Sequence, residues 1–259
     1  MNIVALTNDS ELSRHTLRQI HARFPLQAVV VEARRRPWRA KLRWWLITRP
    51  RSYGWLRTLD QAAFIIYKKL FLEAAENRLR RRMVFQGEPA PDWPPQVPLR
   101  AFDSVNAPEC ADYLRGLAPD VILVLGTSVL KPEVIAAAKN MALNIHCGII
   151  PEYRGGGNFW AFYRGDLGNV GVSIHKVDAG IDTGDILYQQ KIPFTPGQDT
   201  LASHYFKCIL AGTGLFLKAL EDLAQGRAQP YRRQAPDGFF PSHTLTEYLR
   251  TAARLRRGG

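Results

Sequence analysis

Asn144 and His146 are two polar residues, one position apart on either side of Ile145, at the end of a short apolar stretch that begins at Met141. Residues i and i+2 of an extended strand share a face, so the amide and the imidazole should project side by side. Gly148, Pro151 and three consecutive glycines then predict an irregular loop. An amide can donate to a developing oxyanion and an imidazole can move a proton, so the pair is a candidate for acyl-transfer chemistry.

The same pair also has a purely structural interpretation. The asparagine can cap the loop, and the histidine can bond to a backbone carbonyl group. An isolated Asn-x-His does not decide between these interpretations, and the rest of the chain has to be considered.

The composition is that of an ordinary globular protein. The chain has 259 residues, of which 46% are hydrophobic and 22% charged. Three cysteines without a CxxC pair suggest neither a disulfide framework nor a zinc site, and a reducing compartment fits them best. The first ten residues do not resemble a signal peptide, and no apolar run is long enough for a spanning helix. These features predict a cytoplasmic protein.

The positive charge is confined to one segment. The formal net charge is +12, and 15 of the 35 Lys and Arg but only 3 of the 23 Asp and Glu lie between Arg34 and Arg82. Four of the six tryptophans are also there, and 59–79 has an amphipathic helical pattern. We predict a helical insertion over residues 34–83. It can be a hairpin with solvated arginines, a surface for acidic lipid at the inner face of a membrane, or a site for a phosphate-bearing substrate.

Strands and helices alternate outside this insertion. We expect strands over 2–7, 26–31, 97–102, 120–126 and 141–145, and helices over 11–24, 107–117, 132–139 and 205–223. This alternation predicts an α/β fold with a mainly parallel sheet, whose ligands bind at the carboxyl ends of the strands. The first turn lacks G-x-G-x-x-G, which disfavours a nicotinamide cofactor.

Several motifs in order resemble a known family. The chain between Asp120 and Pro193 is similar to the formyltransferases that use 10-formyltetrahydrofolate, among them the glycinamide ribonucleotide, methionyl-tRNA and sugar N-formyltransferases. The residues that carry the resemblance are Asn144-Ile145-His146, Pro151-Glu152-Tyr153-Arg154-Gly155, Gly171-Val172-Ser173-Ile174-His175 and the run from Asp178 to Leu187. Motifs in this order are a stronger indication than any one of them. The resemblance implies a Rossmann-like formyltransferase domain.

The resemblance also implies roles for individual residues. It makes Asn144, His146 and Asp182 the catalytic residues. It places the folate co-substrate at Ser128, Val129, Leu130, Asp178 and Gly180, and the acceptor at Tyr153, Arg154, Gly155 and His175, with no metal. Taken alone, Asp182 would be a turn residue and His175 a buried histidine bonded to backbone.

The expected function is N-formylation of a primary amine. Residues 1–226, with the insertion, should form the catalytic domain and 227–259 a C-terminal extension that is too short for a separate tRNA-binding barrel. We therefore expect a small or carrier-linked acceptor, such as an amino sugar, and no nucleic acid. The alternatives are a formyltetrahydrofolate hydrolase and a catalytically silent, membrane-associated protein of the same fold. The oligomeric state is left open.

Overall fold

A seven-stranded sheet in the order β3-β2-β1-β4-β5-β7-β8 forms the centre of the protein. The computed structural model describes residues 1–33 and 44–256. The strands are β1 (Ile3–Asn8), β2 (Leu26–Glu32), β3 (Leu99–Phe102), β4 (Val121–Leu125), β5 (Met141–His146), β7 (Gly171–Lys176) and β8 (Ile186–Lys191). The first five strands of the sheet order are parallel, whereas β7 and β8 are antiparallel to their neighbours. The predicted α/β fold with a mainly parallel sheet is confirmed, and β4 is the middle strand of the sheet.

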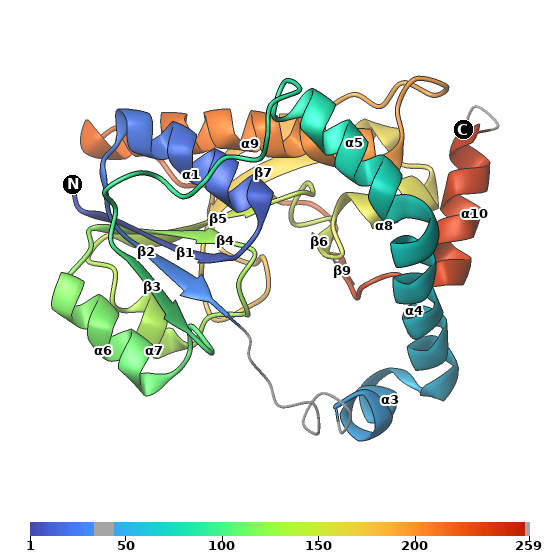
Figure 1. Cartoon of the computed structure of the whole chain (residues 1–259), viewed down its shortest axis with the longest axis horizontal. Helices are drawn as coiled ribbons and strands as arrows, with labels where there is room; N and C mark the ends of the chain where they lie inside the picture. Colours follow the sequence, from blue (N-terminus) through green and yellow to red (C-terminus); the bar gives the residue numbers. More distant parts are fainter. Residues whose placement is uncertain (34–43, 257–259) are drawn as a thin grey trace.

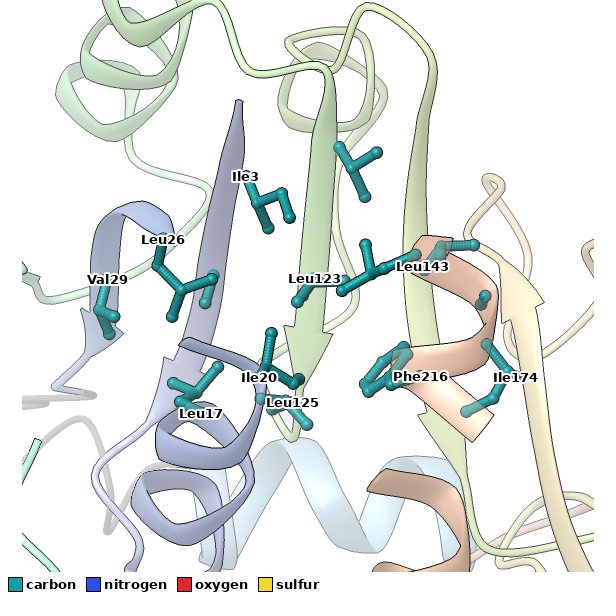
Figure 2. Packing of buried hydrophobic residues seen from close by; sticks show 14 of the residues in the cluster. Ile3, Leu17, Ile20, Leu26, Val29, Leu123, Leu125, Leu143, Ile174 and Phe216 are labelled. Atoms are coloured by element: carbon teal, nitrogen blue, oxygen red, sulfur yellow. The ribbon is translucent and has the colours of Figure 1, made fainter. Parts of the chain in front are cut away.

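Helices cover both faces of the sheet (Figure 1). On one face lie α1 (Glu11–Arg23) and α9 (Leu201–Ala224), and on the other α6 (Pro108–Leu117) and α7 (Pro132–Ile135). Figure 2 shows part of the first core, where Leu17 and Ile20 of α1 and Phe216 of α9 pack with Leu123 and Leu143 of the sheet. Because both faces are covered, the strands read as nearly continuous apolar runs.

Some predicted helix ends are wrong. The helix expected over 132–139 is only the single turn α7. Helix α9 begins at Leu201, before the expected Tyr205, because Thr200 and Ser203 form a capping box there. Ala107, which has no hydrogen-bonding side chain, occupies the cap position of α6. The Asn106 side chain donates to the carbonyl oxygen of Val129 (2.8 Å) and accepts from the N–H of Lys131 (2.7 Å).

Residues 44–83 form what we call the helical arm. It consists of a π-helical turn (Trp44–Thr48), α3 (Arg49–Tyr53), α4 (Trp55–Tyr67), a second π-helical turn (Lys68–Leu72) and α5 (Glu73–Met83). The described part of the predicted insertion is therefore divided into several helical segments, and residues 34–43 of it, with Trp38, lie outside the described residues. The arm runs beside α10 (Leu245–Arg256) and ends against α9 (Figure 1).

The last part of the described chain packs against the loop after β5. The short strands β6 (Arg154–Gly155) and β9 (Phe239–Phe240) pair in parallel, and α10 contacts both α8 (Asn158–Arg164) and α4. Among the helices that the structure describes, none has the length and apolarity needed to cross a bilayer.

Candidate active site

The carboxyl end of β5 carries Asn144 and His146, as the alternation of side chains predicted. The adjacent strand β7 runs antiparallel, and its register places His175 opposite Asn144 and Ser173 opposite His146. Directly opposed residues lie on the same face of a sheet, so all four side chains meet there. The Asn144 Nδ2 atom is 3.1 Å from His175 Nε2. His175 Nδ1 lies 2.7 Å from the carbonyl oxygen of Lys176 and must donate to it, so in the neutral ring Nε2 accepts from Asn144.

Asp182 reaches this group from the loop between β7 and β8. Its Oδ2 atom lies 3.3 Å from His146 Nδ1, and its Oδ1 atom lies 3.4 Å from both His175 Nε2 and Asn144 Nδ2. The N–H of Gly155 also donates to Oδ2 (2.9 Å). The backbone of Asp182 has φ +53°, a left-handed conformation that aspartate adopts more readily than most residues. The structure thus brings the three predicted catalytic residues together.

The ring of His146 has one nitrogen engaged and one facing Asp182. Nε2 is 2.8 Å from the carbonyl oxygen of Tyr153, and because a carbonyl oxygen only accepts, Nε2 carries the proton. Burial lowers the pKa of His146 below its ordinary 6.5, although the charge of Asp182 and the bond to Tyr153 act in the opposite direction. In the resulting neutral ring, Nδ1 carries no proton, and its basic lone pair is directed at the carboxylate of Asp182.

The carboxylate of Asp182 stays ionised. Burial alone would raise the pKa of Asp182, but the neighbouring imidazoles of His175 and His146 and the N–H of Gly155 lower it to about 2. A carboxylate and an imidazole lone pair therefore face each other with no proton between them. A proton delivered to this position would be stabilised by both groups.

The predicted acceptor residues have different surroundings. Gly155 contacts Asp182 through its backbone, and His175 is in the polar group. The Tyr153 phenol is buried and donates to Asp166 Oδ2 (2.6 Å), so the contribution of Tyr153 to the site is its backbone carbonyl. The Arg154 guanidinium pairs with Asp237 (2.5 Å) and donates to the carbonyl oxygen of Ile181 (2.9 Å). An acceptor contact by Arg154 remains a prediction, and it would have to replace one of these bonds.

The loop predicted to hold the folate follows β4. The N–H of Ser128 donates to the buried carboxylate of Glu32 (2.8 Å), which also accepts from the N–H of Val105. Val129 is exposed, whereas Leu130 is buried in the core beneath the loop. The apolar side chain of Val129 is therefore accessible to a ligand, and Leu130 supports the loop from below. This role of Glu32 was not predicted, although an acidic residue at the end of a buried strand was the available indication.

The remaining residues predicted at the folate site shape the loop that carries Asp182. Asp178 Oδ1 accepts from the N–H of Gly180 (3.0 Å) and from the hydroxyl of Thr183 (2.5 Å). A Cβ atom on Gly180 would lie 2.0 Å from Thr183 Oγ1, so the turn requires glycine there. A contact of Asp178 or Gly180 with folate stays a prediction.

Gly148 and Ser173, two residues near His146, have structural roles that were not predicted from the sequence. A Cβ atom on Gly148 would lie 2.5 Å from His146 Nε2 and 2.7 Å from the carbonyl oxygen of Tyr153. Ser173 holds the same turn, because its hydroxyl donates to the carbonyl oxygen of Gly148 (2.6 Å). Glycine at 148 is thus needed for the bond between the His146 ring and the carbonyl oxygen of Tyr153.

A cavity of about 540 Å³ adjoins His146. The loop after β5, the start of α9, the arm and the segment before α10 line it; Phe64, Lys68, Arg80, Phe159, Tyr205 and His243 are among its residues. His243 stacks on Phe159 with ring centroids 3.8 Å apart, and burial lowers the pKa of His243 to about 4. Lys68 pairs with Glu76 and Arg80 with Glu11. The volume is in the range of small-molecule sites, and the lining combines aromatic rings with ion pairs.

Comparisons with known proteins agree with the geometry. A family model described as formyl transferase matches residues 66–220. The methionyl-tRNA formyltransferase of Geobacter sulfurreducens is 35% identical over 115 residues, which is 44% of this chain and 35% of that protein. The enzyme of that name from Idiomarina loihiensis is 33% identical over 139 residues, 52% of this chain and 43% of that protein. The chain thus matches less than half the length of these curated relatives.

Solved structures share the fold. A sugar N-formyltransferase from Shewanella sp. superposes with a TM-score of 0.60 at 14% identity, covering 97% of this chain and 87% of that one. A formyltransferase from Anoxybacillus kamchatkensis, in complex with a formamido-sugar nucleotide and tetrahydrofolate, superposes with a TM-score of 0.50 at 19% identity, covering 69% and 92%. At sequence identities of 14 and 19%, the similarity to these structures shows the fold alone.

Proposed function

Because the chain belongs to the formyl transferase family, we propose that it is a folate-dependent N-formyltransferase. It would move the formyl group of 10-formyltetrahydrofolate to a primary amine of a small or carrier-linked acceptor, such as an amino sugar or a similar biosynthetic intermediate. The observation that carries this proposal is the convergence of Asn144, His146 and Asp182 at the end of β5.

The convergence matches what formyl transfer requires. The amine nitrogen attacks the formyl carbon, the carbonyl oxygen becomes negative, and the nitrogen acquires a proton to lose. Asn144 Nδ2 is the donor available to the oxyanion, because its 3.4 Å contact with Asp182 is long and can be exchanged for a bond to the substrate. One such donor is worth roughly 3–4 kcal/mol in the transition state.

The proton from the amine has a receiving position between His146 and Asp182. The lone pair of His146 Nδ1 accepts it, and the carboxylate 3.3 Å away stabilises the imidazolium that forms. Collapse of the intermediate breaks the bond between the formyl carbon and the folate nitrogen. The proton then passes to that leaving nitrogen, which regenerates neutral His146 and releases tetrahydrofolate.

The cavity beside His146 supports a small acceptor. Its volume of about 540 Å³ suits a molecule of the size of a sugar or a nucleotide portion. The folate donor would approach from the other side, over Val129 and the loop of Asp178. The Nε atom of Arg80 and the Nε2 atom of His243 are buried without a hydrogen-bond partner among the described residues, and both residues line the cavity. Side-chain movements that expose these two nitrogens would allow an acceptor with oxygen groups to bond to them.

The test is turnover of 10-formyltetrahydrofolate with a panel of amines. Purified protein is incubated with the donor and amino-sugar nucleotides, amino acids or other primary amines, and formylated product and tetrahydrofolate are quantified. We expect donor consumption that depends on one class of amine. Donor loss without any amine, with release of formate, would identify a hydrolase. Intact folate binding without turnover for any amine would contradict the proposed transfer.

A further inference from the structure

The helical arm has an apolar face that the rest of the described chain does not cover. Of the 18 large apolar residues that are exposed in the described chain, 10 lie between Leu46 and Phe71. On α4 and the turn after it, Leu56, Leu59, Ile66 and Leu70 follow helical spacing and are 86, 60, 60 and 69% exposed. We call these four residues the outer stripe. Scattered apolar residues on a surface are normal, but a continuous row on one helix is typical of an interaction surface.

The opposite face of α4 is fully used by contacts within the chain. Thr58 and Gln61 are buried, and the Gln61 amide donates to the carbonyl oxygen of Ser242 (2.7 Å). Phe64 packs against the rings of His243 and Tyr248. Arg57 pairs with Glu247 of α10 (2.7 Å). These contacts fix the rotation of α4, so the outer stripe is held away from the domain and does not result from a loosely packed helix.

The charge of the same segment is complementary to an anionic surface. The sequence from Arg34 to Arg82 carries the whole excess of positive charge, and within the described arm Arg51, Lys69, Arg78 and Arg82 are exposed. A second copy of the chain would bring two such cationic segments together, so charge repulsion opposes a dimer through this face. Nucleic acid would use the cations but not the aliphatic side chains.

We propose that the arm docks on an anionic lipid bilayer through the outer stripe, with its exposed Lys and Arg side chains at the headgroups. Apolar side chains beside clustered cations are the features of helices that lie in the membrane interface. The arm would lie on the surface, because no helix among the described residues is long and apolar enough to cross. Residues of the inner face of the arm, Phe64, Lys68 and Arg80, line the cavity beside His146, so docking would bring that cavity close to the lipid. The proposal does not depend on the proposed catalytic function.

The experiment is flotation of the full chain with lipid vesicles. One set of vesicles contains phosphatidylcholine alone, and the other contains phosphatidylcholine with phosphatidylglycerol. We expect binding to the anionic vesicles only, weakened but not abolished by high salt. The variant Leu59→Ser/Ile66→Ser/Leu70→Ser should bind about tenfold more weakly or worse. Circular dichroism and thermal melting should be unchanged, because these side chains are exposed.

A matched control removes exposed apolar side chains elsewhere. Leu99 and Leu249 are 49 and 45% exposed and lie outside the arm, so Leu99→Ser/Leu249→Ser should bind like the parent. Failure of the parent to bind anionic vesicles would overturn the proposal. Equal losses in the stripe and control variants would also do so. A dimer in vesicle-free solution that the stripe variant dissociates would assign the face to a second copy instead.

Discussion

Asp182 connects the three other polar side chains of the site, Asn144, His146 and His175. It does so from a left-handed backbone conformation, which costs of order 1–3 kcal/mol for a residue other than glycine. The hydrogen bonds that its carboxylate accepts from the Asn144 amide and the N–H of Gly155 compensate for that cost. The requirement for aspartate at position 182 therefore has two parts, the charge of the side chain and the left-handed backbone conformation. Mutations can separate these two parts.

Substitutions of the three catalytic candidates test their roles. Asn144→Ala, His146→Ala and Asp182→Ala should each reduce kcat by about two orders of magnitude or more. Asp182→Asn should be as inactive but should lose less stability than Asp182→Ala, since asparagine also tolerates the left-handed conformation. Steady-state kinetics and thermal melting measure both effects.

Asp112→Asn is the control for a carboxylate outside the site, because Asp112 is exposed on α6. Its kcat should equal that of the parent, and folate affinity should be unchanged in all variants. Near-normal turnover of Asp182→Ala would exclude Asp182 and make Asp178 or Asp185 the candidate.

The protonation of His146 sets the expected pH dependence. Burial lowers the pKa of His146 below 6.5, so the ring is neutral at pH 7 and gains a proton only as the pH falls through that lowered value. With saturating acceptor, kcat should be flat near neutrality and fall on the acid side, since the protonated ring cannot act as a base. NMR titration of labelled histidine, assigned with His146→Ala, checks the value directly.

Asp182→Asn should move this titration to still lower pH. The negative charge of Asp182 raises the pKa of His146, and removing it leaves the effect of burial unopposed by that charge. A His146 titration above 6.5 in the parent protein, or an upward shift in Asp182→Asn, would contradict this electrostatic account.

At the scale of elements, two strands and one loop determine the geometry. The antiparallel pairing of β5 with β7 sets His175 beside Asn144, and the turn after β5 returns the carbonyl of Tyr153 to His146. That turn is close-packed at Gly148. The loop is therefore part of the candidate active site, although it supplies only backbone atoms.

Gly148→Ala should disturb the imidazole without removing any polar group. The added Cβ atom would lie 2.5 Å from His146 Nε2, so the ring or the Tyr153 carbonyl must shift. Since loss of orientation by about 1 Å can cost on the order of 100-fold, we expect a fall in kcat of tenfold to 100-fold, roughly. Gly168→Ala is the matched control, because a Cβ atom there meets nothing within 4 Å. Equal kcat values for the two variants would show that the turn has room for a methyl group.

In the molecule as a whole, the excess of positive charge and the polar residues of the candidate site belong to different segments of the chain. The polar group at β5 lies at the end of a buried sheet, whereas the net charge of +12 belongs to the segment from Arg34 to Arg82. The two regions meet at the cavity, where Lys68 and Arg80 of the arm and His146 contribute to one lining. The arm can therefore affect acceptor binding without altering the reacting groups.

For an acceptor with a phosphate or diphosphate group, KM should depend on ionic strength. The Debye length falls from about 10 Å at 0.1 M salt to roughly 3 Å at 1 M, which screens the charges of the arm. The acceptor KM should rise with salt, while the KM for the folate donor stays nearly constant. Lys68→Gln should raise the acceptor KM and flatten its salt response, and Lys131→Gln, outside the arm, should do neither. An acceptor KM that does not change with salt would show that the charge of the arm does not contribute to acceptor binding. The charge would then serve another role, such as lipid binding.

Local sequence patterns were sufficient to predict the class of fold and to select the main residues of the candidate site. Side-chain alternation in a strand is a local property, so Asn144 and His146 could be placed on one face without knowledge of any neighbour. Ordered motifs then related Asp182 to this pair across a long separation. The insertion was visible because its charge and tryptophan content differ from those of the rest of the chain.

The groups that these residues contact could not be predicted from the sequence, because they depend on strand register and packing. The register between β5 and β7 places His175 at the site. Strand β6 pairs with β9, and Arg154 of β6 forms an ion pair with Asp237, which lies shortly before β9. The Tyr153 phenol points to Asp166 because the loop turns it into an aromatic cluster. The amphipathic pattern of the arm indicated one apolar face, but α10 packs against a different face and leaves the outer stripe exposed. Register and packing arise from contacts between segments far apart in the chain, and a local pattern does not encode them.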